Sequence, residues 1–103
     1  MLFMLNIEVS IPAEMPQADK DALRQREDER AMQLVKAQKL RRIWRIVGQT
    51  ANFSVWQAAS LEELHEAVQS LPMFPYMKVT VVPLIQHPVT TAWTSKNGAM
   101  PAF

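Results

Sequence analysis

Apolar and polar side chains alternate at the start of the chain, which predicts a β-strand. One set of alternating positions is apolar throughout and consists of Phe3, Leu5, Ile7 and Val9. A period of two is typical of a strand, and Pro12 ends this one. Apolar side chains also occur in the other set, at Leu2 and Met4. We therefore expect both faces of this strand to be covered, as in a barrel or an oligomer.

Residues 16–39 change to the pattern of an amphipathic helix. They are strong helix formers without glycine, and their one proline stands at the start. Residues at helical spacing form one face, which consists of Leu23, Glu27, Ala31, Leu34 and Gln38. Glu27 puts a carboxylate in the middle of this apolar stripe, and such a break in the binary pattern is expected at a functional site. Glu27 is therefore the first candidate for chemistry.

The next residues predict a β-hairpin. Ile43–Val47 is rich in β-branched and aromatic side chains, and Ala51–Trp56 alternates in the same way as the first strand. Gly48 and Gln49 stand between the two segments and can form the turn. We expect the two strands to pair directly with each other.

A second helix and a last strand follow the hairpin. Ser60 with Glu63 three residues later has the spacing of a capping box, which predicts that a helix begins there. The inner face of this helix is expected to consist of Leu61, Leu64, His65 and Val68. A loop at 71–76 contains two prolines and leads into a valine-rich strand at 77–84.

The element order β-α-β-β-α-β predicts a ferredoxin-like α+β fold in residues 1–88. Two helices would cover one face of a four-stranded antiparallel sheet and leave the other face open. The large side chains expected on that open face are Met4, Trp44 or Ile43, and Trp56. An exposed apolar area of this size usually marks an interface or a ligand cavity, so we expect a homo-oligomer.

Periodicity is lost from about residue 86, so residues 89–103 are expected to be a tail without regular structure. The tail nevertheless contains Trp93 and Phe103, which are unusual residues to leave in water. We therefore expect it to pack on a neighbouring subunit.

Composition narrows the function further. The 103 residues suffice for one domain, and a net charge of +1 indicates neither a nucleic acid nor a membrane surface as partner. The chain contains no cysteine, which excludes disulfides and thiolate catalysis, and its two histidines argue against a histidine metal centre. The apolar start has neither a basic region nor the length of a membrane span, so a cytoplasmic protein is expected.

Glu27 allows two interpretations from the residues alone. In an apolar setting, desolvation would raise its pKa and make it a competent general base. Alternatively, it pairs with Arg24 or Arg30 in an ordinary helix ion pair.

The other polar candidates are equally open. Arg45 lies in an apolar strand and either meets a bound anion or occupies an exposed edge. Asn52 can donate to a ligand oxygen or close the hairpin, and Tyr76 can offer its hydroxyl to a pocket or anchor its loop. His65 is either a packing residue of the second helix or a further binding residue.

Two segments of the chain resemble the muconolactone Δ-isomerase family. One is the strand Leu40–Gly48 with its Trp-Arg pair, and the other is the loop Leu-Pro-Met-Phe-Pro-Tyr-Met at 71–77. The similarity extends in order from Met1 through Ala51–Val55 to His87 and Pro88.

The resemblance implies a ferredoxin-like fold in a large ring-like oligomer, typically a decamer. It also implies an isomerase without metal or cofactor in aromatic catabolism, through the catechol and β-ketoadipate route. Such an enzyme moves the ring double bond of muconolactone to give 3-oxoadipate enol-lactone. Glu27 matches the family's first-helix glutamate, and Arg24 matches the basic residue one turn earlier. Candidate partners for the substrate's oxyanion and acetate arm are then Arg24, Arg45, Asn52 and Tyr76.

The chain departs from the family at two aromatic positions. Thr50 and Phe53 stand where tyrosines are usual, so a substituted muconolactone is an alternative substrate. A second hypothesis is a cofactor-free oxygenase of the dimeric α/β-barrel group, which would use Asn52, His65 and Trp44. A third is a ligand-binding module that kept the fold and lost the activity.

Overall fold

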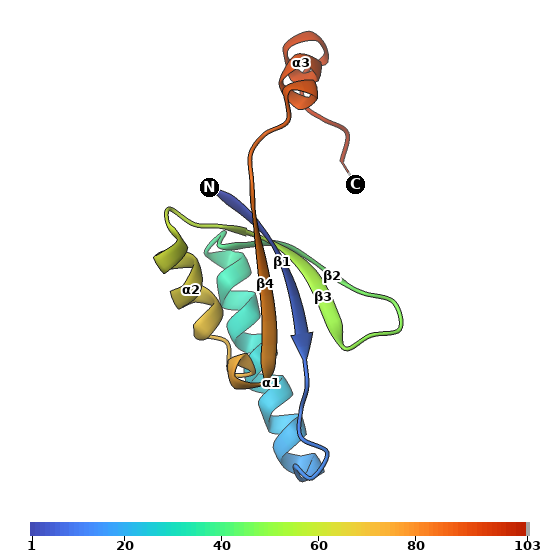
Figure 1. Ribbon diagram of the computed structural model, residues 1–103, viewed down its shortest axis with the longest axis vertical. Coiled ribbons are helices and arrows are strands. Elements are labelled where there is room, and N and C mark those ends of the chain that lie inside the picture. Colours follow the sequence, from blue (N-terminus) through green and yellow to red (C-terminus); the bar gives the residue numbers. More distant parts are fainter. Residues whose placement is uncertain (103) are drawn as a thin grey trace.

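The computed structural model describes residues 1–102 and contains one four-stranded antiparallel sheet with two helices packed on one face (Figure 1). The strand order is β2-β3-β1-β4, so the chain's first strand lies inside the sheet between the third and the fourth. The predicted α+β ferredoxin-like arrangement is confirmed. The elements are β1 (Leu2–Val9), α1 (Gln17–Lys36), β2 (Leu40–Arg45), β3 (Ala51–Gln57), α2 (Leu61–Gln69), the short 3-10 helix η1 (Phe74–Tyr76), β4 (Met77–Leu84) and α3 (Pro88–Asn97).

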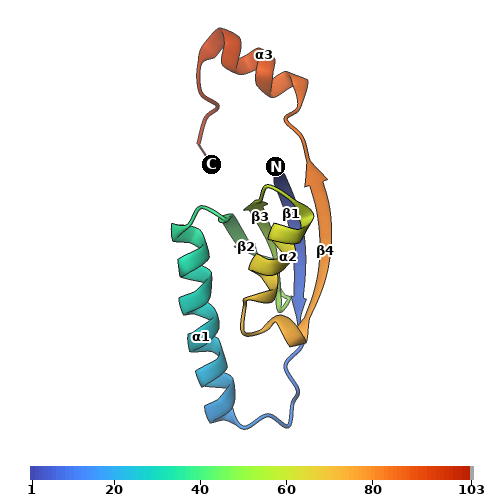
Figure 2. The same cartoon turned by 90° about the vertical axis from the view of Figure 1, so that its left-hand side faces the viewer.

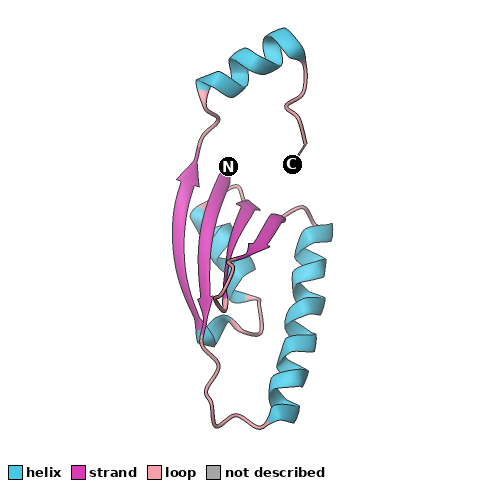
Figure 3. Cartoon of the chain, turned by 90° about the vertical axis from the view of Figure 1, so that its right-hand side faces the viewer, coloured by secondary structure: helices cyan, strands magenta, loops and turns pink. Residues whose placement is uncertain are grey.

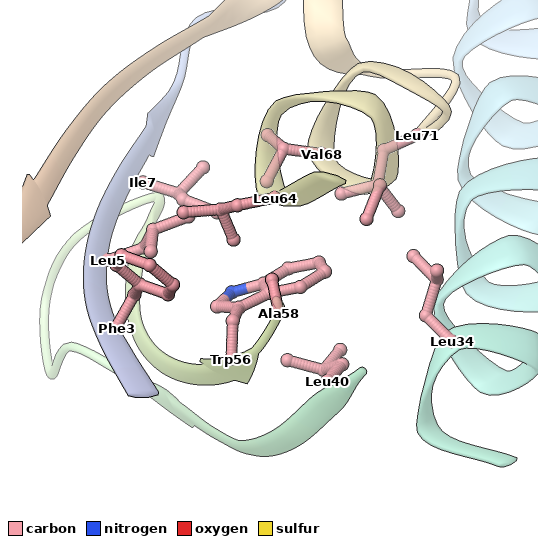
Figure 4. Packing of buried hydrophobic residues seen from close by; sticks show 11 residues of the cluster. Phe3, Leu5, Ile7, Leu34, Leu40, Trp56, Ala58, Leu64, Val68 and Leu71 are labelled. Atoms are coloured by element: carbon pink, nitrogen blue, oxygen red, sulfur yellow. The ribbon is translucent and has the colours of Figure 1, made fainter. Parts of the chain in front are cut away.

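The core lies between the sheet and the two helices. Of the alternating side chains of β1 that the sequence pattern assigns to one face, Phe3, Leu5 and Ile7 are buried here and Val9 is partly buried. Leu34 of α1 and Leu64 of α2 close the core from the other side (Figure 4). Burial of these side chains is the main favourable contribution that fixes the helices on the sheet.

Trp56 corrects one prediction. The sequence pattern puts it on the open face, but it is 1% exposed and lies at the centre of the core in Figure 4. The register explains this position, because Trp56 is paired with Phe3, and cross-strand partners project to the same side of a sheet. Its indole Nε1 donates to Ser54 Oγ at 2.8 Å, which satisfies the polar atom that burial would otherwise leave without a partner.

The boundaries of α1 and β2 differ from the prediction. The helix ends at Lys36 instead of 39, and Gln38 adopts a left-handed conformation with φ of 60°. This turn allows Leu40 to enter the sheet, where it is 2% exposed and opposite Trp56. The strand therefore begins three residues earlier than predicted, with a bulge between Leu40 and Arg42, and Gln38 is not on the helical face.

The start of α2 agrees with the sequence prediction. Ser60 Oγ accepts from the Glu63 amide at 3.1 Å, and Glu63 Oε2 accepts from the Ala59 amide at 2.9 Å. Two amides that would have no partner inside the helix are thereby satisfied. The hairpin turn is also in the expected place, with Gly48 at φ of 80° between β2 and β3.

The C-terminal segment contradicts the expectation of irregular structure, because Pro88–Asn97 forms the helix α3. His87 caps it, since its Nδ1 accepts from the Val89 amide at 3.0 Å, and Pro88 is tolerated in the first turn because no partner for its missing amide is needed there. Figures 2 and 3 show α3 beyond the end of β4, clear of the sheet and of the other helices. Phe103 lies outside the described residues. Across residues 1–102, no helix has both the length and the apolar composition to cross a membrane.

Candidate active site

A cavity of about 180 Å³ lies beside α1, where this helix faces the β2–β3 hairpin and the loop before β4. The elements that surround it are far apart in the sequence and meet only in the folded chain. The residues that line it comprise seven apolar and six polar or charged ones, which offer a ligand both apolar surface and hydrogen-bonding groups. They are Val9, Ile11, Arg24, Glu27, Asp28, Ala31, Ile43, Arg45, Thr50, Ala51, Asn52, Met73 and Met77.

Glu27 is the carboxylate that this cavity holds in a half-buried position. Its Oε1 accepts a hydrogen bond from the Met73 backbone amide at 2.8 Å. Burial raises the pKa of Glu27, the Met73 hydrogen bond lowers it, Asp28 raises it and Arg24 lowers it, with burial the largest effect. The net direction is upward, which brings the carboxyl closer to the range where a general base works at neutral pH.

The ion-pair interpretation of Glu27 does not describe the contacts of the two nearby arginines. Arg24 Nε lies 3.6 Å from Asp28 Oδ1, one helical turn further along α1. Arg30 Nε donates to Ser70 Oγ at 2.9 Å and its Nη1 donates to Gln33 Oε1 at 2.9 Å. Glu27 is thus held by a backbone amide, and Arg24 contributes only the smallest influence on its pKa.

Two guanidinium groups line the same cavity. Arg24 comes from α1, and Arg45 is the last residue of β2, on the sheet face that the helices cover. Both residues are exposed, so their charges remain hydrated. Arginine suits carboxylate recognition because its planar fork can form two parallel hydrogen bonds. Two cations beside one carboxylate can bind an anionic substrate and still leave a base next to it.

Asn52 and Thr50 complete the polar part of the cavity. Asn52 is paired with Arg45 across the hairpin and with Ile7 on β1. Its Oδ1 is buried and has no hydrogen-bond partner within residues 1–102. Most buried polar atoms are paired, so this oxygen is available to accept a hydrogen bond from a bound molecule. Thr50 stands at the rim, and its backbone oxygen accepts from the Val9 amide at 3.0 Å.

Two predicted site residues lie elsewhere. His65 is exposed on α2 and lines a second, larger groove of about 400 Å³ between α2 and β4. Its ring packs edge-on against Phe74 with centroids 5.9 Å apart. Tyr76 ends η1 and does not line the Glu27 cavity, and its backbone oxygen accepts from the Ser10 amide at 2.9 Å. The larger groove contains no carboxylate or arginine among its lining residues, so the chemistry belongs to the smaller cavity.

The residues required by the oxygenase hypothesis are not brought together. Asn52 lines the Glu27 cavity, and His65 lines the groove on the far side of α2. Trp44 is paired with Phe53, so it projects from the opposite face of the sheet to Asn52. This separation removes the constellation of side chains on which the hypothesis depends. Within residues 1–102 no cluster of three or more His, Cys, Asp or Glu is placed to hold a metal ion.

Ile11 and Met73 are site residues that the sequence did not indicate. Ile11 follows β1 in a loop, and Met73 enters the site through both its side chain and its amide. A backbone donor leaves no trace in residue type, so periodicity could not have found it. The loop composition at 71–76 was the available signal, and it pointed to a turn without naming its partner.

Known proteins of one family match this chain in sequence and in structure. The sequence model of the muconolactone delta-isomerase family matches residues 1–90. The muconolactone Delta-isomerase of Cupriavidus pinatubonensis is 41% identical over 88 residues, which are 85% of this chain and 96% of that protein. The enzyme of Acinetobacter baylyi is 40% identical over 88 residues, covering 85% and 92% of the two chains.

The structural comparison points to the same family as the sequence comparison. A crystal structure of muconolactone isomerase superposes with a TM-score of 0.80 at 40% identity, over 85% of this chain and 92% of that one. The residues that the family model matches include the sheet, the two packed helices and the residues that line the Glu27 cavity. This chain belongs to the muconolactone Δ-isomerase family.

Proposed function

We propose that this chain is a muconolactone Δ-isomerase of the catechol branch of the β-ketoadipate pathway, with Glu27 as its single proton-transfer group. The observation that carries the proposal is the position of Glu27. It is a half-buried carboxylate with a raised pKa, in a cavity that it shares with Arg24 and Arg45. The names of the relatives give the reaction, and the cavity supplies the groups that this reaction requires.

The reaction is a 1,3-shift of a proton within the lactone ring. The Glu27 carboxylate removes the ring proton at the carbon γ to the lactone carbonyl, and the C–H electron pair moves into the ring to give a dienolate. The resulting carboxyl group then returns the proton to the α carbon, which leaves the double bond between the β and γ carbons. No external acid, base or oxidant is consumed. One carboxylate can carry out both steps because the α and γ carbons belong to the same small ring.

The charges of the cavity suit the intermediate. Negative charge moves onto the carbonyl oxygen of the lactone in the dienolate. Arg45 or the side-chain NH2 of Asn52 can donate to this oxygen. Arg24 is then the partner for the acetate arm of the substrate. Tyr76 takes no part in this scheme because it does not line the cavity.

The substrate is muconolactone or a ring-substituted analogue. Of the two aromatic positions at which the chain departs from the family, only Thr50 lines the cavity. Phe53 is paired with Asn6 and Trp44, so its side chain projects from the other face of the sheet. Thr50 is therefore the residue that would admit a substituent on the ring, and a comparison of kcat/KM for muconolactone and methyl-muconolactone in wild type and Thr50→Tyr tests this.

The test of the reaction uses purified protein, muconolactone and 1H NMR, without added metal and under argon. We expect conversion to the enol-lactone by the wild type, and loss of at least about a thousandfold in kcat for Glu27→Gln, which cannot accept the proton. Glu29→Gln is the matched control, because Glu29 is an exposed carboxylate two residues further along the same helix. Full activity of Glu27→Gln would exclude Glu27 as the base. No turnover of any lactone by the folded wild type would favour a binding module. Oxygen consumption with a quinol, in a separate assay under air, would favour an oxygenase.

The proposal includes a homo-oligomer, as large as a decamer by family resemblance. The open face of the sheet supports it, because large apolar side chains there are strongly exposed. Leu2 and Trp44 are each 41% exposed, Phe53 43% and Val82 49%. Register places all four on the face away from the helices. Light scattering should give a mass several times that of one chain, and Phe53→Glu should lower it.

The tail at 89–103 is proposed to pack on a neighbouring subunit. Its described part has no extensive contact with its own sheet in Figures 1–3, although Val89, Trp93 and Met100 are 66%, 43% and 50% exposed. A chain cut after Leu84 should then form less stable oligomers than the full chain. A cytoplasmic location completes the proposal, since the pathway's substrates are small water-soluble carboxylates.

A further inference from the structure

We infer that the backbone amide of Met73 is the positioning group of the active site, and that the turn around Pro72 exists to present it to Glu27. This inference rests on the proposed function, because it assigns a task to one bond of the same carboxylate. Three observations carry it: the geometry of the turn, a second bond that holds the loop to α1, and the composition of the cavity wall.

The turn leaves the Met73 amide without a partner of its own. Phe74 N donates to Leu71 O at 2.9 Å, which closes a four-residue turn from Leu71 to Phe74. Met73 has φ of −81° and ψ of 0°, the values of the third residue of a type I turn, and Pro72 occupies the second position, where its fixed φ is favourable. The closing bond of such a turn uses only the amide of the fourth residue. The amide of Met73 therefore remains available, and Glu27 Oε1 accepts from it at 2.8 Å.

A second bond holds the same loop against α1. Arg30 Nε donates to Ser70 Oγ at 2.9 Å, and Ser70 Oγ donates to Ala67 O at 2.6 Å. Arg30 follows Glu27 by three residues, and Ser70 precedes Met73 by three. The loop therefore lies antiparallel to α1, with its two bonds to the helix one turn apart. A pair of matched bonds fixes the distance and the register between the helix and the loop, which one bond alone would not do.

The two carboxylate oxygens of Glu27 therefore have different roles. Oε1 is occupied by the Met73 amide, so Oε2 is the oxygen that takes the proton from the γ carbon and returns it to the α carbon. An unanchored glutamate has three rotatable bonds and would point along many directions, most of them useless for both carbons. Anchoring one oxygen restricts the other to a small region of the cavity, which Met73 and Ala31 also line.

The surroundings of Glu27 determine how the bond affects its titration. The charged side chains that line the cavity with it are Arg24 and Asp28 from α1 and Arg45 from β2, and the remaining walls from β1, β3 and the Met73 loop are uncharged. A hydrogen bond from an amide favours the ionised carboxylate, so the Met73 amide lowers the pKa of Glu27 against the effect of burial. Removal of this amide should therefore raise the pKa of Glu27 and move the acidic limb of the kcat profile to higher pH.

The test removes the amide hydrogen of Met73 and keeps its side chain. Proline at position 73 is unsuitable, because a proline would drive the preceding residue out of the helical region and break the turn. We would instead replace Met73 by its α-hydroxy acid through nonsense suppression, which exchanges the N–H for an ester oxygen and keeps the side chain. The same replacement at Met32, an exposed residue of α1, is the matched control for a lost backbone hydrogen bond.

We expect the Met73 ester to lower kcat about tenfold to a hundredfold with KM little changed, since positioning affects the transition state more than binding. The acidic limb should move to higher pH, and the 13C resonance of the Glu27 carboxyl should titrate at higher pH in the same protein. The Met32 ester should lower the stability of the protein. It should not change kcat, the acidic limb of the kcat profile or the pH at which the Glu27 13C resonance titrates. A Met73 ester with wild-type kcat and an unmoved Glu27 resonance would overturn the inference.

Ser70 variants test the second bond by ordinary mutagenesis and remain informative if the Met73 ester does not fold. Ser70→Ala should lower kcat severalfold, and Ser70→Thr, which keeps the hydroxyl, should restore it. Equal activity of both variants and wild type would contradict a positioning role for this bond. The carboxyl titration does not depend on turnover, so it distinguishes a wrong positioning role from a wrong reaction: a wild type that isomerises no lactone contradicts the proposed function alone.

Discussion

Shortening Glu27 by one carbon is the most direct test of the idea that its carboxylate must be in one place. Glu27→Asp keeps the charge and the chemical type of the base but draws the carboxylate back toward the backbone of α1 by about 1.5 Å, one carbon–carbon bond. The Met73 bond is 2.8 Å long in the wild type. An aspartate oxygen would then lie at about 4.3 Å if helix and loop stay in place, which is too far for a hydrogen bond.

The expected loss follows from this displacement. A misplacement of about 1 Å in a catalytic group can cost on the order of a hundredfold in rate, so we expect kcat of Glu27→Asp to fall about a hundredfold. The fall should be smaller than that of Glu27→Gln, because an aspartate can still accept a proton when thermal motion brings it near the ring. KM should change by less than threefold or so, since Arg24 and Arg45 bind the substrate's charge and are not altered.

The assay is 1H NMR of the isomerisation in D2O, which reports both the product and the deuterium incorporated at the α carbon. Initial rates at saturating muconolactone give kcat, and circular dichroism at the same temperature verifies the fold. A Glu27→Asp enzyme within threefold of the wild type would refute the reasoning, because a carboxylate that tolerates a shift of this size is not held in one position. An activity as low as that of Glu27→Gln would instead mean that no residual approach occurs.

Three further outcomes follow from the structure. The pKa of Glu27 is raised in the folded protein, so its contribution to stability is present at low pH and is lost as the pH rises through its folded pKa. Glu27→Gln should therefore resist urea better than the wild type at pH 7. The difference between the two proteins should shrink at pH 4. Leu34→Ala should cost about 2–5 kcal/mol in the free energy of unfolding, because Leu34 is 1% exposed and is one of the two buried side chains of α1; a cost below about 1 kcal/mol would contradict its place in the core. Arg24→Gln should raise KM for muconolactone about tenfold with kcat little changed, and an unchanged KM would remove Arg24 as the partner of the acetate arm.

The fold could be predicted because its signals are local. The period of two in β1, the helix formers of α1 and the capping box of α2 each act within a few residues, and each occurs where the sequence placed it. The boundaries of the elements were harder to predict from the sequence, since the end of α1 depends on the burial of Leu40 at the start of β2. That requirement is tertiary, and no window of helix propensity contains it.

Trp56 shows what limits a prediction of faces. In Ala51–Gln57 both alternating sets contain an aromatic residue, Phe53 in one and Trp56 in the other, so hydrophobicity alone does not choose between them. Ser54 supplies the missing criterion. It lies on the same face as Trp56 and accepts the indole N–H, so the set with a hydroxyl can bury a tryptophan with its polar atom satisfied. Polar partners two residues apart on a strand thus carry information about which face is buried.

The candidate site divides in the same way between what the sequence contains and what only the fold brings about. Glu27 could be found because a carboxylate out of pattern on a helix is visible in residue type, and the turn at Pro72 could be found from its proline. Their meeting could not, since the bond joins residues 46 positions apart and its donor is a backbone amide common to nearly every residue. A turn that leaves an amide free and a helix that buries a carboxylate are each incomplete, because the first has an unused donor and the second an ion that burial destabilises. The fold removes both deficits with one contact, because the amide of Met73 and the half-buried carboxylate of Glu27 each gain a partner that its own segment does not supply.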